Sequence, residues 1–270
     1  WEICCQTPGK KSGSIKIVSE ELGLNLWHQR YSQQAKWSQE IRQYLLEKIT
    51  LGEGDKILEV GSGTGAVLSL FSEETHAQCW GIDIDFASLS FSAKLVYPLY
   101  LAAGDAYSLP FPDHSFSVCY CHYLLLWLKH PLDVIAEMAR VTQPGGRVIA
   151  LAEPDYQARI DYPKELAQLG DIQTQSLKAQ GADTTMGRKL SGLFHDAGLQ
   201  NITSGILGAQ WDPTETREFD ETEWLMIQTD TADHLSPEVF ATYRKAENKA
   251  RREGKRVLFI PTFYAAGIVP

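Results

Sequence analysis

The feature that most constrains the fold of this sequence is a run of alternating glycines directly after a short apolar strand. Residues 57–60 (ILEV) have the composition of a buried strand, and residues 61–65 (GSGTG) follow without a break. Glycines let the backbone turn tightly and let a ligand approach without meeting a Cβ atom. A helix that begins after such a turn presents free N–H groups. The pattern therefore predicts a ligand site at the carboxyl end of a central strand.

Apolar runs and turns alternate regularly after this point. A helix is expected after Pro131, and it ends before the turn at residues 144–146 (PGG). Alternation of strands and helices at this spacing predicts right-handed crossovers and a mostly parallel sheet with helices on both faces, an α/β fold. Further strands are expected at residues 79–84, 100–103, 116–122 and 147–152.

The two ends of the chain have a different character. Apolar residues recur at helical spacing up to about residue 51, as at Ile41, Leu45 and Ile49. Helices are expected at residues 163–180 and 186–197, and strands at 201–207 and 257–268, with a helical stretch between those two strands. We therefore expect an N-terminal helical cap over residues 1–51, a core over 52–210, a helical insertion over 211–255 and the last core strand over 256–270.

Charge and cysteine content limit the partners of the chain. The net charge is -9, from 25 basic and 34 acidic residues, which disfavours an anionic partner such as a nucleic acid or a phospholipid face. The basic run at residues 245–256 contains Glu247 and Glu253, which favours a solvated helix face.

No apolar run approaches the roughly 20 residues that span a bilayer. No secretory signal is visible, although the sequence begins at Trp1, and five cysteines fit reduced thiols. A cytoplasmic protein is expected.

Three carboxylates accompany the expected strand ends and discriminate between two ligands. Asp83 ends the second strand, Asp105 follows the third, and Glu59 lies in the first. The glycines also fit the dinucleotide pattern, so an NAD(P)-dependent oxidoreductase must be considered. A dinucleotide site explains Asp83 but leaves Asp105 and Glu59 without a role. A cofactor with one nucleoside and an amino-acid tail explains all three, although Asp83 and Asp105 could also cap the helices that follow them.

The order of these motifs resembles that of class I methyltransferases, which use S-adenosylmethionine (SAM). The chain is similar to the broad group that includes the ubiquinone- and menaquinone-pathway methyltransferases. The resemblance implies a Rossmann-like, mostly parallel seven-stranded sheet with SAM as the methyl donor. It is carried over about 100 residues by residues 57–65 (ILEVGSGTG), 81–84 (GIDI), 104–106 (GDA) with 109–111 (LPF), 116–118 (FSV) and 140–146 (RVTQPGG).

The resemblance also implies roles for individual residues near the cofactor. Gly61, Ser62 and Gly63 would pass under the methionine part, with Glu59 beneath them facing the ammonium group. Asp83 would take both ribose hydroxyls. The remaining cofactor contacts implied are Ile84 against the adenine, Asp105 and the Ala106 amide at the adenine edge, Cys121 and His122 beside the methionine and the sulfonium, and Tyr31 closing over the cofactor.

Residues 119–122 (CYCH) are not expected to form a metal-binding site. Cys119 and Cys121 would point to one face of a strand and His122 to the other, so the three side chains cannot converge on one ion without distortion. A structural zinc site would also need a fourth ligand at a recognisable spacing. Buried thiols in a core strand are the better interpretation, and no metal is expected.

The sequence sets only broad limits on the molecule that accepts the methyl group. Methyl transfer from a sulfonium needs an oriented acceptor, and a general base only if the acceptor must lose a proton. His122 is the first candidate for that base, although it could equally shape the pocket. Aromatic, helical segments at both ends predict an enclosed pocket for a small or medium-sized, partly apolar acceptor. A non-catalytic SAM-binding protein stays an alternative, and the oligomeric state is open. The residues expected to line the acceptor are Glu153, Asp155, Tyr156 and Trp211.

Overall fold

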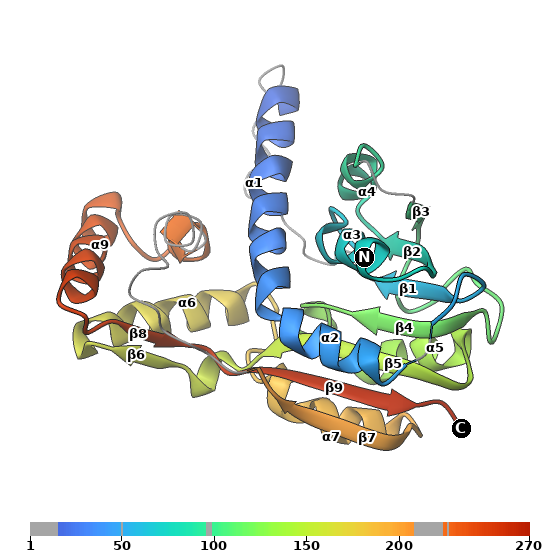
Figure 1. Cartoon of the computed structure of the whole chain (residues 1–270). Helices are drawn as coiled ribbons and strands as arrows, with labels where there is room; N and C mark the ends of the chain where they lie inside the picture. The colour runs from blue at the N-terminus through green and yellow to red at the C-terminus, as the bar shows by residue number, and fades with distance from the viewer. Residues whose placement is uncertain (1–15, 50, 96–98, 208–223, 226) are drawn as a thin grey trace.

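A computed structural model describes residues 16–49, 51–95, 99–207, 224–225 and 227–270, with backbone only for residues 16–22 and 37. The N-terminal part of the expected cap, residues 1–15, and Trp211 lie outside the described residues. The centre of the molecule is a seven-stranded sheet in the order β3-β2-β1-β4-β5-β9-β7 (Figure 1). Its strands are β1 (Lys56–Val60), β2 (Gln78–Asp83), β3 (Leu99–Ala103), β4 (Phe116–Cys121), β5 (Thr142–Pro154), β7 (Gln200–Ile206) and β9 (Thr262–Ile268).

Strand direction confirms the predicted mostly parallel sheet. The strands β3, β2, β1, β4 and β5 pair in parallel, whereas β9 is antiparallel to both β5 and β7. The strand β7 therefore runs in the same direction as β5. Six of the seven strands point their carboxyl ends to one edge of the sheet, where ligands bind in open α/β folds.

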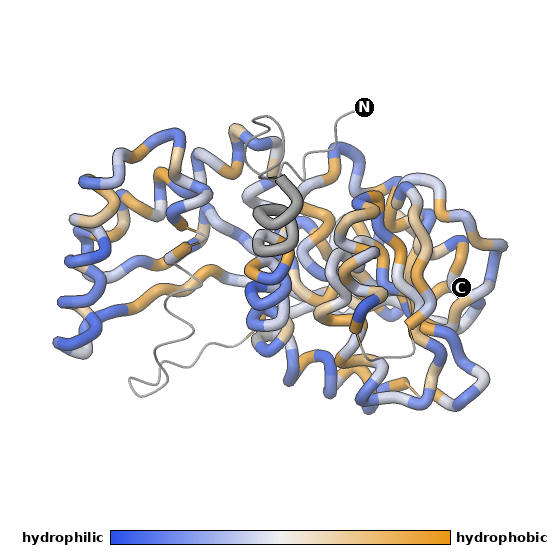
Figure 2. The backbone as a smooth tube through the Cα atoms, turned by 90° about the horizontal axis from the view of Figure 1, so that it is seen from above, coloured by the Kyte–Doolittle hydropathy of each residue, from blue (hydrophilic) through white to orange (hydrophobic). Residues whose placement is uncertain are grey.

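Helices cover both faces of this sheet. The described helices around it are α1 (Lys16–Trp37), α2 (Gln39–Glu47), α3 (Ala66–Glu74), α4 (Phe86–Ser92), α5 (Pro131–Val141) and α7 (Met186–Asp196). Residues on one side of β4, including Cys119 and Cys121, join a core cluster with Ile135 of α5. Their neighbours Val118 and Tyr120 join a second cluster with α2 and α3. The alternation expected for β4 is thus present, and Figure 2 shows hydrophobic residues concentrated along the sheet.

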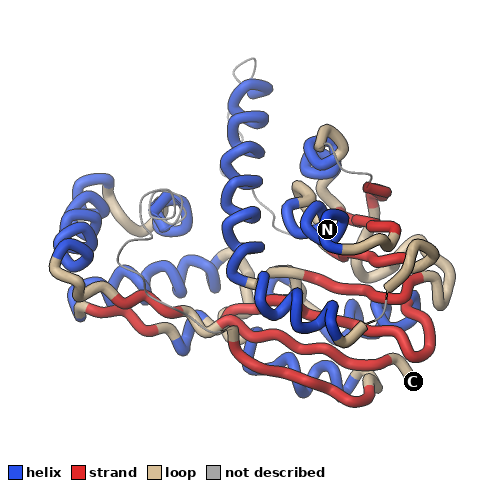
Figure 3. Tube along the Cα trace, in the orientation of Figure 1, coloured by secondary structure: helices blue, strands red, loops and turns tan. Residues whose placement is uncertain are grey.

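A smaller group of elements lies beside the main sheet, and we call it the small lobe (Figure 3). Its two-stranded antiparallel sheet pairs β6 (Ile160–Tyr162) with β8 (Val257–Phe259). Its helices are η3 (Lys164–Leu166), α6 (Ala167–Ala179), residues 224–225 with 227–231, and α9 (Pro237–Arg252). The core of the small lobe consists of Leu169, Trp224, Ile227 and Phe240, all of which are buried.

A polar network ties the two strands of the small lobe to each other. Asp161 on β6 accepts hydrogen bonds from Arg159 Nε at 2.6 Å and from Arg256 Nη2 at 3.1 Å. All three side chains are less than a tenth exposed. Because a buried carboxylate is stable only when it is paired, this arrangement holds β6 and β8 together.

The end of the chain differs from the prediction. One strand was expected over residues 257–268, but β8 and β9 are separate strands in different sheets. Pro261 lies between them, and proline cannot donate a hydrogen bond to a sheet. The described part of the expected insertion contains helices, as predicted. Residues 211–223 are not among the described residues. The domain boundaries themselves stay a prediction. None of the described helices is both long and apolar enough to cross a lipid bilayer.

Candidate functional site

The glycine turn after β1 is held firmly against the neighbouring strand. Gly61 and Gly63 adopt positive φ angles of 75° and 48°, a conformation that glycine reaches without strain. The amides of Gly61 and Ser62 donate to the carbonyl oxygen of Ile82 on β2, at 2.8 and 3.0 Å. A Cβ atom on Gly61 would lie 2.9 Å from Leu124 Cδ1, so the turn is also packed against the segment after β4. The turn is preorganised by these contacts.

Asp83 links the end of β2 to the same turn. Its Oδ2 atom accepts a hydrogen bond from the Gly63 amide at 2.7 Å, and its Oδ1 atom accepts one from the Asp85 amide at 2.8 Å. Burial raises the pKa of Asp83, and these two bonds oppose that shift. Each carboxylate oxygen can accept a second hydrogen bond. Asp83 is therefore oriented while it retains acceptor capacity for two hydroxyl groups.

An aromatic side chain of α1 also reaches the glycine turn. A Cβ atom on Gly63 would lie 3.9 Å from both Asp83 Oδ2 and Tyr31 Cε2. Tyr31 also contacts Trp27, with ring centroids 5.6 Å apart. The structure thus brings together Tyr31, Gly63 and Asp83, three of the residues predicted for cofactor binding.

The end of β3 lies next to Asp83. The Gly104 amide donates to the Asp83 carbonyl oxygen at 3.0 Å, and Asp105 follows directly. Asp105 Oδ1 accepts a hydrogen bond from the Tyr107 amide at 2.9 Å, which holds the turn. Ala106 is partly buried against the core, whereas the side chain of Ile84 is 57% exposed. The end of β2 therefore carries an exposed apolar side chain, and Asp105 follows the neighbouring strand β3.

Glu59 lies beneath the glycine turn, in the interior of the protein. Its side chain is 2% exposed, and its Oε2 atom accepts a hydrogen bond from the Tyr120 hydroxyl at 3.0 Å. Burial, together with the negative charge of Asp83, raises the pKa of Glu59 to about 8, against the opposing effect of the Tyr120 hydrogen bond. The carboxyl group of Glu59 is consequently largely protonated at pH 7.

Ser62 contributes its backbone rather than its side chain to the turn. The hydroxyl is buried without a hydrogen-bond partner among the described residues. It faces β2, since a Cβ atom on Gly81 would lie 2.7 Å from it. A ligand above the turn would therefore meet the Ser62 main chain.

Cys121 and His122 end β4 on the other side of the turn. Cys121 is buried as a free thiol, and burial raises its pKa. His122 is partly buried, and its Nε2 atom lies 3.4 Å from Ser38 Oγ, between α1 and α2. Burial, together with the nearby Arg42 charge, lowers the pKa of His122 to about 3. The described residues contain no group of three His, Cys, Asp or Glu side chains arranged for a metal ion.

Glu153 lies near the carboxyl end of β5, as expected, but its side chain points into the protein. It was expected to line the acceptor, but its side chain is fully buried and accepts three backbone hydrogen bonds, from Leu124, Leu125 and Leu126 at 2.9, 2.8 and 3.1 Å. It thereby holds the short helix η1 (Leu125–Trp127) that follows β4. Tyr123, just before this segment, has a positive φ of 54°. Glu153 shapes the segment after His122 from inside.

Asp155 is also an internal residue. It is 1% exposed, accepts from the Ala158 amide in the short helix η2 (Tyr156–Ala158), and pairs with Arg188, whose Nη2 atom lies 2.8 Å away. Tyr156 is partly buried and donates its amide to the Thr184 carbonyl at 2.9 Å. Of the four predicted acceptor residues, only Tyr156 is thus both described and partly exposed.

Two contacts of the N-terminal helices were missed by the sequence interpretation. His28 Nδ1 lies 3.0 Å from Thr64 Oγ1 in the glycine turn, and Ser38 lies beside His122. Both join residues more than 30 positions apart, and no local pattern marks such pairs. Together with Tyr31 they show that α1 and the start of α2 cover the carboxyl end of β1 and β4.

Comparison with known proteins identifies the core. Residues 58–150 match the profile of the methyltransferase domain family. This stretch contains the glycine turn, Asp83, Asp105 and His122. Residues 58–150 form a methyltransferase domain. The family resemblance inferred from the motifs is therefore confirmed.

The relatives of this methyltransferase domain are named for different methyl acceptors. A malonyl-(acyl-carrier protein) O-methyltransferase of Marinomonas sp. is 29% identical over 125 residues, which are 45% of this chain and 46% of that protein. A demethylmenaquinone methyltransferase of Mycobacterium sp. is 36% identical over 99 residues, which are 37% of this chain and 42% of that protein. The chain thus matches less than half the length of these two relatives.

Solved structures share the fold. Phosphoethanolamine N-methyltransferase 2 of Haemonchus contortus, solved in complex with SAM, superposes with a TM-score of 0.53 at 14% identity. The match covers 82% of this chain and 50% of that one. The similarity therefore extends beyond the methyltransferase domain to most of the present chain.

Proposed function

We propose that the chain is a SAM-dependent methyltransferase that transfers a methyl group to a small or medium-sized, partly apolar acceptor. The observation that carries the proposal is the convergence of the glycine turn, Asp83 and Asp105 at one sheet edge. The direct hydrogen bond from Gly63 to Asp83 joins the first two parts. A ligand with one nucleoside and an ammonium-bearing amino-acid tail matches the carboxylates of this edge in charge and in hydrogen-bonding capacity.

In this proposal the adenosyl part lies at the ends of β2 and β3. Asp83 accepts hydrogen bonds from the two ribose hydroxyls, and the exposed Ile84 packs against the adenine ring. Asp105 and the Ala106 amide bind the adenine edge. The exposure of Ile84 supports this assignment, because an adenine ring packed against it would contribute about 25 cal/mol for each Å² of apolar surface removed from water.

The amino-acid tail of the cofactor is assigned to the ends of β1 and β4. The Gly61, Ser62 and Gly63 backbone lies under it, with Tyr31 above and Cys121 at the side. Glu59 supplies negative charge beneath the turn once the ammonium group of the cofactor lowers its raised pKa. The bound cofactor supplies the electrophilic methyl group.

The chain then acts on the acceptor mainly by orientation and by exclusion of water. Well-oriented reactants can gain roughly 7–11 kcal/mol relative to free encounter. His122 lies at the end of β4 but is a weak base, because its pKa is lowered to about 3. We therefore assign His122 to the wall beside the sulfonium, where a neutral imidazole donates or accepts a hydrogen bond. An acceptor whose attacking atom need not lose a proton requires no general base.

The nature of the acceptor rests on the elements that border this edge. The helix α1 and the small lobe both lie on the side to which the carboxyl ends of the parallel strands point (Figure 1). Exposed apolar side chains on β6, Ile160 and Tyr162, lie in the small lobe. The two relatives described above are named for different acceptors, so the proposal of a partly apolar acceptor depends on these residues of the present chain.

The test is methyl transfer to a metabolite extract. The full chain is incubated with the extract and with SAM that carries a trideuterated methyl group, and the products are read by mass spectrometry. The proposal predicts release of S-adenosylhomocysteine (SAH) and at least one small molecule that gains a labelled methyl group. Asp83→Ala serves as the control with a damaged cofactor site. SAH binding without any labelled product would indicate a non-catalytic binding protein, and binding of NADH without binding of SAM or SAH would indicate an oxidoreductase.

A further inference from the structure

Ser38 lies at the junction of α1 and α2 and does not cap the helix that it precedes. It occupies the N-cap position of α2, where a serine commonly accepts a hydrogen bond from a backbone amide of the first turn. Its side chain makes no such bond, although the residue is completely buried. The hydroxyl instead donates to the Ala35 carbonyl oxygen at 3.0 Å and lies 3.4 Å from His122 Nε2. The Ser38 hydroxyl therefore connects the end of α1 with the end of β4.

The surroundings of Ser38 fix the direction of its hydroxyl proton. A serine hydroxyl has one hydrogen to donate and accepts through its lone pairs. The contact with the Ala35 carbonyl is the shorter of the two, so it takes the proton. Arg42 Nη1 donates to the same carbonyl at 3.1 Å, and a carbonyl oxygen can accept two hydrogen bonds. Ser38 consequently turns a lone pair toward His122.

His122 must therefore supply the proton of this contact. Burial, together with the Arg42 charge, lowers the pKa of His122 to about 3, so its ring is neutral at pH 7 and carries a single N–H group. Because a lone pair of Ser38 faces Nε2, the hydrogen is on Nε2. Nδ1 then keeps its lone pair, and it makes no hydrogen bond with any residue that the structure describes.

The position of His122 gives this lone pair a role. Cys121 pairs in register with Val60, so His122 lies level with Gly61 at the start of the glycine turn. His122 is only partly buried, and this is the place where SAM and the acceptor meet in the proposed function. A nitrogen lone pair there binds a hydroxyl or an N–H group, which a carbon nucleophile does not offer.

We propose that Ser38 is a positioning residue that holds His122 as the Nε2–H tautomer, so that Nδ1 accepts a hydrogen bond from a hydroxyl or N–H group of the methyl acceptor. The tautomer is a property of the free chain, whereas the identity of the donor group rests on the proposed methyl transfer. The hydrogen bond directs a lone pair of the acceptor atom toward the methyl carbon. That lone pair forms the new bond, and the electrons of the broken carbon–sulfur bond stay on the sulfur of SAH. The acceptor proton passes to water, because His122 is too weak a base to keep it.

The tautomer is measured by long-range proton–nitrogen NMR of the full chain with ¹⁵N-labelled histidine at pH 7. The chain has 7 histidines, and the His122 signals are identified by their loss in His122→Gln. Couplings to the ring protons distinguish Nε2 from Nδ1. We expect a protonated Nε2 and an unprotonated Nδ1. In Ser38→Ala the Nε2–H group loses its acceptor, so the two nitrogen signals should shift toward each other as the tautomers mix. The reverse tautomer in the wild type, or an unchanged His122 spectrum in Ser38→Ala, would overturn the proposal.

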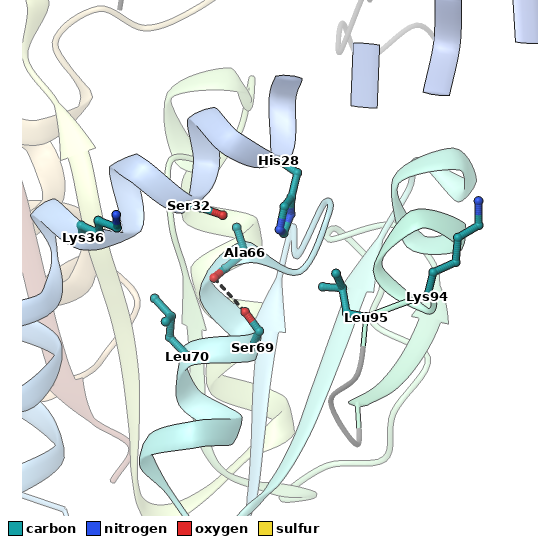
Figure 4. Close-up of a pocket in the computed structure, with 8 residues that line it drawn as sticks. All are labelled: His28, Ser32, Lys36, Ala66, Ser69, Leu70, Lys94 and Leu95. Carbon is teal, nitrogen blue, oxygen red and sulfur yellow. Dashed lines mark hydrogen bonds between the residues drawn. The ribbon is translucent and has the colours of Figure 1, made fainter. Parts of the chain in front are cut away.

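Ser69→Ala is the matched control for Ser38→Ala. Ser69 is also buried, and its hydroxyl also donates to the carbonyl oxygen three residues earlier, that of Ala66, at 3.1 Å (Figure 4). Among the described residues, Ser69 forms no hydrogen bond with a histidine. Ser69→Ala should therefore leave the His122 spectrum unchanged. Equal spectral changes in the two variants would assign the effect to the loss of any buried serine and would contradict a specific role of Ser38.

The donor group is tested by the position of the methyl group in the labelled products of the extract assay. Fragment spectra should place the trideuterated methyl group on oxygen or nitrogen. At limiting acceptor, Ser38→Ala should form these products about fivefold more slowly, as expected for the loss of one neutral hydrogen bond, and Ser69→Ala should match the wild type. Products methylated only on carbon, or equal rates in Ser38→Ala and the wild type, would overturn the assignment of the donor group. The NMR measurement needs no turnover, so it tests the role of Ser38 even if the proposed methyl transfer fails.

Discussion

Gly63 donates its amide hydrogen to Asp83 Oδ2 over 2.7 Å, so the glycine turn after β1 and the acidic end of β2 form one hydrogen-bonded unit. The backbone amide fixes the direction of the carboxylate before any ligand arrives. Preorganisation of this kind strengthens binding because less freedom is lost when the ligand is bound. The relationship also means that a change at Asp83 affects the turn as well as the proposed ribose contacts.

Replacement of Asp83 should weaken cofactor binding strongly. We predict that Asp83→Ala raises the dissociation constant of SAH at least tenfold, which corresponds to about 1.4 kcal/mol. Both the hydroxyl contacts and the Gly63 hydrogen bond are lost in this variant. Isothermal titration calorimetry measures the effect, and Asp171→Ala on the exposed surface of α6 is the control. An unchanged dissociation constant would show that Asp83 does not hold the ribose.

Cofactor binding should release a proton from Glu59. The pKa of Glu59 is raised to about 8 in the free protein, so its carboxyl group is largely protonated at pH 7. A nearby ammonium group favours the charged form and lowers that pKa. The affinity for SAH should therefore increase as the pH rises from 6 to 8, and it should level off above pH 8.

The proton release is measured by calorimetry at pH 7 in buffers of different ionisation enthalpy. Glu59→Gln keeps an oxygen that can accept from Tyr120 but cannot titrate, so its SAH affinity should be nearly independent of pH in this range. The same pH dependence in the variant and in the wild type would assign the proton to another group.

Loss of Glu153 should destabilise the fold. In Glu153→Ala three backbone amides lose their acceptor, and each unsatisfied buried group costs about 1–3 kcal/mol. We predict a loss of roughly 4 kcal/mol in the free energy of unfolding, measured by urea denaturation. Glu153→Gln keeps one acceptor oxygen and should lose less, and Glu165→Ala at an exposed position should lose little. Wild-type stability in Glu153→Ala would contradict the internal role.

Cys119 should matter for stability but not for ligand binding. It is fully buried on β4, and burial raises the pKa of its thiol well above the ordinary value. In Cys119→Ser a hydroxyl group replaces the thiol in an apolar environment, at a cost of about 1–3 kcal/mol. We predict a lower melting temperature with an unchanged dissociation constant for SAH. A large loss of SAH affinity at constant stability would place this thiol at the site.

The parallel sheet could be predicted because its pattern is local. Each strand and helix from residue 56 to 152 has its own apolar run and its own turn residues, and the order of these units largely determines the topology. The division of the last strand was harder to see, although Pro261 marks it. The strand β8 pairs with β6, about 100 residues earlier in the chain, and β6 is only three residues long.

The candidate site was predictable to a similar extent. The strand-end rule placed Asp83, Asp105 and Glu153 at the correct edge of the sheet. It could not tell that Glu153 turns inward, because the amides that it binds come from residues 124–126, nearly 30 positions away. Asp155 was misjudged for the same reason, since Arg188 is its distant partner. A carboxylate after a strand looks the same in sequence whether it binds a ligand or the protein itself.

The most direct measurement of the central claim is a crystal structure of the full chain with SAH. Both ribose hydroxyl oxygens should lie within about 2.6–3.2 Å of the Asp83 carboxylate, with the homocysteine part over the 61–63 turn. A structure in which SAH binds away from Asp83, or in which this edge stays empty at saturating SAH, would contradict this claim.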